Sequence, residues 1–217
     1  MAKGTDFGGV HSSRDLHLIQ QKVEVQPAEP KLNLIDIPGA DGSKDLSEVP
    51  AGRMTYKDRK ISWTFALYPG ENWADKHRQV SAALNGKRCS ITLDEDPGYY
   101  YNGRVVVKQY TRDRLLRQIT VEATCQPYML KQQPTSVTAD LTTAYTSITL
   151  SNQNKPVIPT IEVTAKTTLL WNGATVTVNA GTFTSLDIEL TQGENLLEAK
   201  TESGTGKITI TYQEGAL

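Results

Sequence analysis

The chain has 217 residues, with 23 Lys and Arg against 24 Asp and Glu, a formal net charge of −1 at pH 7 and an isoelectric point near 6.3. This length predicts one large or two ordinary domains, each able to bury a core without disulfides or metals. The balanced charge argues against a nucleic-acid or membrane-surface partner, and no apolar run approaches the roughly 18 residues of a membrane span. The first residues also lack the apolar core of a secretory signal, so we expect a soluble protein synthesised in the cytoplasm.

The opening half of the chain is dominated by β-type patterns. Residues 60–67, "KISWTFAL", alternate large apolar side chains with polar or small ones, which predicts a half-buried strand. Further strands are expected at 88–93, 99–111 and 117–128, and the short connections 94–98 and 112–116 join them as an antiparallel meander.

One segment, residues 71–87, has helical spacing. Trp73, His77, Val80 and Leu84 recur at steps of four, three and four, which places them on one face of a helix. The pair 85–86, Asn-Gly, is expected to close that helix with a left-handed cap. We therefore predict an N-terminal β-sandwich domain with one α-helix packed on a β-sheet.

Composition changes after residue 134. Residues 135–217 hold four Lys against eight Asp and Glu and are rich in Thr, and the Gln132–Thr135 stretch is typical of a linker. We predict two domains, 1–132 and 135–217. In the second, short Thr/Val/Ile-rich runs recur about every ten residues, and Asn172-Gly173 is typical of a two-residue hairpin turn. This pattern predicts a β-sandwich.

Residues suited to catalysis or metal binding are few. Cys89 and Cys125 lie in strand-like contexts without metal-ligand spacing and are interpreted as buried apolar side chains. The acidic run 94–96 lacks the further ligands of a calcium loop and is interpreted as a hairpin turn. His11 and His17 lie beside Ser and Asp residues, but a catalytic triad converges from separate elements, so both are interpreted as polar surface residues. We expect no enzyme activity, cofactor or metal.

The long polar stretch between residues 38 and 57 needs another explanation. Loops of this length in compact domains usually bind something or extend from the body. Its order of turn and strand residues predicts a protruding hairpin whose mixed charges suit a partner surface, including that of a second copy. The candidate inter-subunit residues are Pro38, Gly39, Asp41, Lys44, Asp45, Leu46, Glu48, Arg53 and Tyr56.

Several segments taken in order resemble one family. "DIPGADGSKDLSE" (36–48), "KDRKISWTFAL" (57–67), "VSAALNGKRCSITLDEDPGYYYNGRVVV" (80–107) and "ITVEATCQPYML" (119–130) are similar to the N-terminal domain of distal tail proteins of long-tailed bacteriophages. The resemblance covers about residues 4–130.

The resemblance implies a structural role in the virion. Such proteins form a ring, typically a hexamer, through N-terminal β-domains, and a hairpin extension clasps the neighbouring subunit. The ring joins the tail tube to the tip and meets the tube protein, the tape measure protein and a tail-associated lysin or receptor-binding component. The C-terminal domain is a β-sandwich, galectin-like or a plain adaptor.

A carbohydrate-binding module is the alternative hypothesis. It rests on Trp171 beside the 172–173 turn and on the tyrosines at 99–101, because exposed aromatic rings stack on sugars. Host cell-wall glycans would then be the ligand. Trp171 is equally placed to fill the core of the sandwich.

Overall fold

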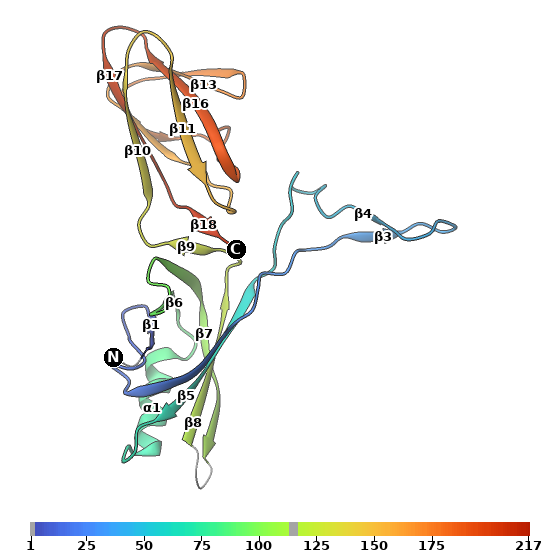
Figure 1. Cartoon of the computed structure of the whole chain (residues 1–217), viewed down its shortest axis with the longest axis vertical. Helices are drawn as coiled ribbons and strands as arrows, with labels where there is room; N and C mark the ends of the chain where they lie inside the picture. The colour runs from blue at the N-terminus through green and yellow to red at the C-terminus, as the bar shows by residue number, and fades with distance from the viewer. Residues whose placement is uncertain (1–2, 113–116) are drawn as a thin grey trace. The chain divides into compact units, whose positions relative to one another are not determined.

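The computed structural model describes residues 3–112 and 117–217 and divides the chain into two compact units, 1–129 and 130–217. The mainly-β fold with one helix and an extended hairpin is confirmed (Figure 1). Residues 132–134 of the predicted linker lie between strands β9 (Met129–Lys131) and β10 (Thr135–Leu141).

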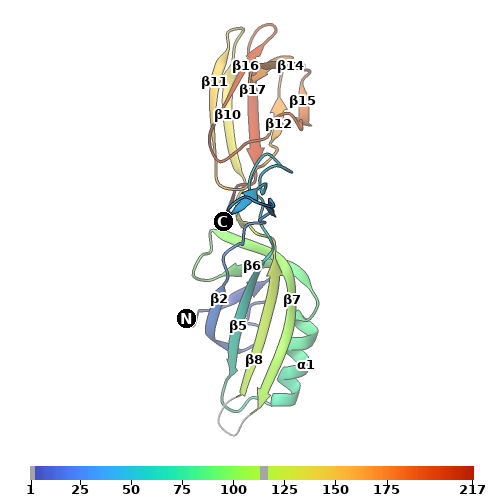
Figure 2. The ribbon, with the colours of Figure 1, turned by 90° about the vertical axis from the view of Figure 1, so that its right-hand side faces the viewer.

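Six strands of the N-terminal unit form one antiparallel sheet in the order β1-β6-β7-β8-β5-β2, as Figure 2 shows for its long strands. The elements of this unit are β1 Thr5–Phe7, β2 Leu18–Val25, β3 Leu34–Asp36, β4 Ser43–Asp45, β5 Arg59–Leu67, α1 Trp73–Leu84, β6 Arg88–Leu93, β7 Tyr99–Arg112 and β8 Arg117–Cys125. The predicted meander β6-β7-β8 is confirmed. Residues 113–116 of the expected β7–β8 connection lie outside the described residues.

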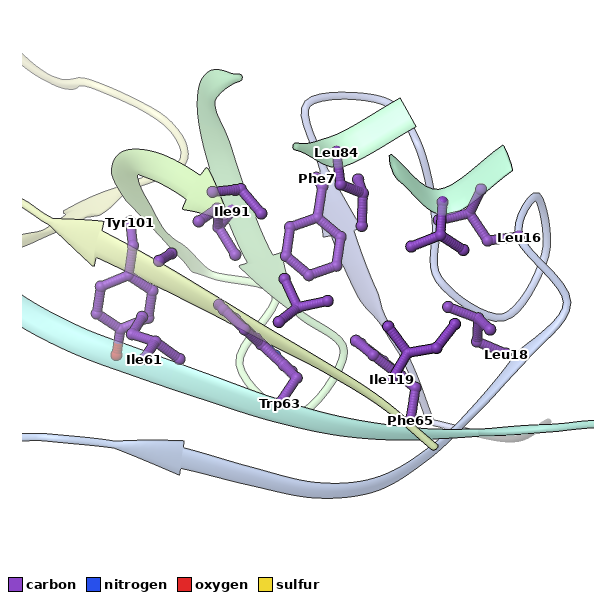
Figure 3. Close-up of a cluster of buried hydrophobic side chains, with 14 of the residues drawn as sticks. Phe7, Leu16, Leu18, Ile61, Trp63, Phe65, Leu84, Ile91, Tyr101 and Ile119 are labelled. Carbon is purple, nitrogen blue, oxygen red and sulfur yellow. The ribbon is translucent and has the colours of Figure 1, made fainter. Parts of the chain in front are cut away.

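The core of this unit lies on the inner face of β5 and β8. Ile61, Trp63 and Phe65 are fully buried, as the alternation in β5 predicts, and Phe7 of β1 and Leu84 of α1 pack over them (Figure 3). The sheet therefore curls so that its β1–β6 end and the helix enclose the core. Where the sequence analysis expected a β-sandwich, one curled sheet and a helix supply both layers.

The indole of Trp63 is held by a short polar relay inside this core. Its Nε1–H donates to Thr5 Oγ1 at 3.0 Å, and the Thr5 hydroxyl donates to Gln20 Oε1 at 2.7 Å. The Phe7 ring meets the indole edge-on, with centroids 5.0 Å apart. This relay ties β1, β2 and β5 together because a buried indole N–H needs an acceptor.

The predicted helix is present, with both ends capped. The Asn72 side chain accepts the N–H of Ala74 at 2.9 Å, and Gly86 follows the last turn with φ +78°, the left-handed conformation expected there. Val80 is fully buried on the predicted face, whereas His77 is exposed and lies against a tyrosine ring.

Gly103 in β7 marks the closest approach of two strands. A methyl group placed there would lie 2.5 Å from Cys125 Sγ and 2.6 Å from the Thr124 carbonyl oxygen. Cys125 is fully buried, and burial raises the pKa of its thiol to about 12. Cys89 is half-buried, so only Cys125 is the fully buried side chain that the sequence analysis expected.

The C-terminal unit is a sandwich of two four-stranded sheets, β10-β17-β12-β15 and β11-β16-β13-β14. Its further strands are β11 Thr146–Asn152, β12 Thr160–Val163, β13 Thr167–Trp171, β14 Ala174–Val178, β15 Gly181–Thr184, β16 Gly193–Thr201, β17 Gly206–Tyr212 and β18 Gly215–Ala216. Asn172 and Gly173 have φ +47° and +82° and join β13 to β14, which confirms the predicted turn. Residues 185–188, which follow β15, form a turn in which the Ser185 carbonyl accepts the N–H of Ile188.

Candidate assembly interface

A hairpin arm, defined here as residues 32–54, leaves the N-terminal unit between β2 and β5 and extends away from the sheet (Figure 1). Its base is closed by backbone hydrogen bonds. Lys31 N donates to the Thr55 carbonyl and Lys57 N donates to the Glu29 carbonyl, each at 2.8 Å. The two ends of the arm therefore lie side by side.

The outer part of the arm is a two-stranded ribbon. β3 and β4 pair antiparallel and, within the described residues, with no other strand. The connection between them turns through Gly39 and Gly42, whose φ angles of +84° and +75° favour glycine. Across the ribbon the Ser43 hydroxyl donates to the Asp36 carboxylate. Both outer edges of this ribbon are therefore not paired with another described strand.

A second set of hydrogen bonds fixes the middle of the arm. Leu46 N donates to the Asn33 carbonyl and Asn33 N donates to Ser47 Oγ, each at 2.8 Å. Ser47, 5% exposed, also donates through its hydroxyl and its N–H to Asp45, and these bonds lower the pKa of that carboxyl. These hydrogen bonds hold the arm in one defined conformation.

Large apolar side chains gather on the arm and remain exposed. They are Leu32 (60% exposed), Leu34 (54%), Ile35 (46%), Ile37 (48%) and Val49 (72%). Side chains alternate along a strand, so Leu34 and Ile35 point to opposite faces of the ribbon. The Leu34 face also carries Asp36 and, because Asp45 is the register partner of Leu34, a second carboxylate. Exposed apolar side chains grouped in this way mark an interaction surface.

The residues singled out from the sequence are spread along the same arm. Pro38, Gly39 and Asp41 lie in the β3–β4 connection, Lys44 and Asp45 in β4, Leu46 and Glu48 after it, Arg53 near the end of the arm, and Tyr56 at the base, where its ring meets Tyr128 edge-on. The sequence analysis missed the apolar residues, although the run "LNLIDI" at 32–37 contains four of them. That run was interpreted as the strand that Pro38-Gly39 ends, and none of its apolar residues was singled out.

The aromatic residues considered for sugar binding lie elsewhere. Trp171 is only 8% exposed and belongs to the core of the C-terminal sandwich. Of the three tyrosines, Tyr101 is buried to the same degree and donates its hydroxyl to the sulfur of Met129. Stacking on a sugar requires an exposed ring, which neither Trp171 nor Tyr101 offers, whereas Tyr99 and Tyr100 are half-buried.

The prediction that His11 is a surface residue was wrong. His11 is 4% exposed, and its Nε2 lies 3.2 Å from each carboxylate oxygen of Asp94. Its Nδ1 accepts the backbone N–H groups of Ser13 and Arg14, so Nε2 carries the hydrogen shared with Asp94. The imidazole therefore ties the N-terminal loop to the turn between β6 and β7. His17 is exposed, as predicted.

Within residues 3–112 and 117–217, no group of three or more His, Cys, Asp or Glu side chains is placed to hold a metal ion. None of the helices described is long and apolar enough to cross a membrane.

The fold of the chain matches that of a solved phage protein. The chain is similar to the crystal structure of the SPP1 Dit (gp 19.1) protein, described as a paradigm of the hub adsorption apparatus in phages that infect Gram-positive bacteria. The TM-score is 0.68 and the sequence identity 18%, with 100% of each chain covered. The resemblance to distal tail proteins expected from the sequence is thereby confirmed at the level of the fold. No model of a protein family and no curated protein matches the chain.

Proposed function

We propose that this protein is a structural component of a bacteriophage tail tip, and that its copies assemble into a ring through the hairpin arm. The observation that carries the proposal is the arm itself, a hydrogen-bonded ribbon with five exposed aliphatic side chains on a chain with a tail-hub fold. An element of this kind needs a partner because both its strand edges and its apolar side chains are left uncovered.

The assembly has the physical form of a heterologous ring. One patch on each subunit, the arm, contacts a different patch on the next subunit. The ring closes when the rotation that relates neighbouring subunits is a whole-number fraction of a full turn. A ribbon laid on a neighbouring surface contributes main-chain hydrogen bonds as well as apolar burial. The function is geometric, so no residue acts as a catalyst and no cofactor takes part.

The finer features of the proposal follow the predicted resemblance to distal tail proteins. The ring is a hexamer of N-terminal units, 1–132 by the sequence boundary, and it connects the tail tube to the tip. Its neighbours are the tube protein, the tape measure protein and a tail-associated lysin or receptor-binding protein. The C-terminal unit, 135–217, lies outside the ring as an adaptor, and the protein resides in the virion.

The arm can be removed without disturbing the sheet, which makes the proposal testable. Because Lys31 and Thr55 are hydrogen-bonded across the base, residues 32–54 can be replaced by Asn-Gly, a two-residue hairpin turn. Negative-stain electron microscopy and native mass spectrometry of the purified protein, over a concentration series, should show closed rings for the wild type. The arm-less variant should remain monomeric with an unchanged circular dichroism spectrum.

Two outcomes would overturn the proposal. One is a wild-type protein that stays monomeric at the highest soluble concentration and on addition of its tail-tube protein. The other is a folded arm-less variant that forms the same rings at the same concentrations. A matched control replaces Asn172-Gly173 in the C-terminal unit by Asp-Gly, which keeps the turn and should leave ring formation unchanged.

A further inference from the structure

An apolar cleft opens on the N-terminal unit where the turn after β1, the end of α1 and the start of β6 meet. Its volume is about 290 Å³. The walls include Phe7, Val10, Ala83 and Cys89, and the rim carries the cations Lys87 and Arg88. Lys87 and Arg88 are exposed, and the wall residues other than Phe7 are half-buried, so the cleft is open to a partner.

The walls of the cleft are held in place by backbone hydrogen bonds. Gly8 N donates to the Ser90 carbonyl at 2.8 Å. Glycine is favoured at this position because its φ is +65° and because a methyl group there would lie 2.8 Å from Cys89 Cβ. On the other side, Gly86 N donates to the Val105 carbonyl at 2.8 Å and ends the helix. The cleft therefore exists before any partner binds.

The arm carries the complementary chemistry. Four carboxylates and two cations lie within residues 32–54. Two of these carboxylates, Asp36 and Asp45, flank the exposed Leu34 on one face of the ribbon. An aliphatic side chain between two carboxylates matches an apolar cleft with two cations at its rim. The opposite face of the ribbon, with Ile35 and Lys44, does not match it.

The positions of the two surfaces suit a head-to-tail contact. In Figure 1 the arm extends to the right of the N-terminal unit, whereas β1, β6 and α1, which line the cleft, lie on its left. If the arm lies on one side of each subunit and the receiving cleft on the other, the arm of one subunit can contact the cleft of the next. Repeating this head-to-tail contact between identical subunits produces a ring.

We propose that the cleft receives the Leu34 face of the arm of a second copy, with Asp36 and Asp45 facing Lys87 and Arg88. This inference rests on the proposed function, because it names the surface that the arm engages in the ring. The apolar contact holds the ribbon, and the charge pairs select the face and direction in which it binds.

A disulfide formed between copies tests the contact directly. In Leu34→Cys, oxidation with copper phenanthroline should join the new thiol to Cys89 of the next copy, the two thiols losing two protons and two electrons to the copper oxidant as one S–S bond forms. Covalent dimers and higher multimers should appear on a non-reducing gel. They should be absent from Leu34→Cys/Cys89→Ser and from Ile35→Cys, whose thiol lies on the opposite face.

Charge reversal gives a second, independent readout. Lys87→Glu/Arg88→Glu should raise the concentration for half-maximal ring formation roughly tenfold or more, since like charges then oppose docking. Asp36→Lys should recover part of that loss in the same chain. The control Lys60→Glu/Lys166→Glu makes the same change in net charge at exposed sites away from the cleft and should change assembly little.

The outcomes separate this inference from the proposed function. One outcome would overturn the cleft as the receiving site and leave the ring proposal standing. In that outcome, removal of the arm prevents ring formation, but the charge reversal does not change it and no disulfide forms through Cys89. A wild-type chain that forms no ring overturns both.

Discussion

The exposed aliphatic side chains of the arm allow the strength of its contact to be estimated. Leu34, Ile35 and Ile37 are each about half exposed, at 54%, 46% and 48%. Complete burial of such a side chain contributes about 1.5–3 kcal/mol, so covering the exposed half contributes about 0.7–1.5 kcal/mol each and about 2–4.5 kcal/mol together. Replacing all three by Ser should therefore weaken association roughly 30-fold to 2,000-fold per arm if the neighbouring copy covers both faces of the ribbon, of which Leu34 alone accounts for roughly 3-fold to 13-fold.

Sedimentation velocity over a range of protein concentrations measures this loss. The triple variant should assemble only at correspondingly higher concentration, while its far-ultraviolet circular dichroism stays that of the wild type. Leu186→Ser is the control, because Leu186 is the most exposed large apolar residue of the C-terminal unit, at 83%, and lies outside the arm. If the triple variant and the wild type assemble at the same concentration, apolar burial by the arm does not drive assembly.

The remaining predictions concern the two units themselves. Thr5→Val keeps the shape of the side chain but leaves the buried Trp63 N–H without its acceptor, so urea unfolding of the N-terminal unit should show a loss of about 1–3 kcal/mol that Thr5→Ser largely avoids. Gly103→Ala should cost about 1–3 kcal/mol in the same assay, because the added methyl meets a backbone oxygen that cannot rotate away. Glu214 is buried, which alone would raise its pKa, but hydrogen bonds from Thr135 and Lys131 outweigh burial and lower it below 4.5. The ionised Glu214 carboxylate therefore stabilises the C-terminal unit above pH 4.5, and this stabilisation is lost as the pH falls through the lowered pKa. The free energy of unfolding of Glu214→Gln should depend less on pH in this acid range. A pH profile identical to that of the wild type would contradict this prediction.

Elements with a strong local signal were predictable from sequence. The alternation around Trp63 fixes which face of β5 is buried, and Asn172-Gly173 specifies its turn because both residues take positive φ angles. β10 was not predicted as a strand, since its Thr and Ser residues mask the inward alternation that ends in the buried Leu141. Its pairing with β17, some 70 residues away, supplies the missing information.

The burial of single polar residues was not predictable in the same way. His11 lies in a segment of polar residues, and its burial follows from the approach of Asp94, which is distant in sequence. The arm shows the reverse case. Its position and hairpin form were evident from turn residues, but the exposure of Leu34 and Ile35 was not, because apolar residues in a strand are usually buried.

The exposure of these side chains is also what connects the arm to assembly. A ribbon of two short strands is marginally stable in water by itself, and the bonds through Ser47 and at the Lys31–Thr55 base supply the order that its own core cannot. Order of this kind lowers the entropy lost when the arm docks, because the ribbon is already in its paired conformation. In a loop with no partner, exposed apolar side chains on an ordered ribbon would contribute no stability. The open strand edges would also make the protein prone to aggregation. The same two features become favourable together when a second copy covers the ribbon, which supports our proposal that the arm is one half of an interface whose other half lies on another subunit.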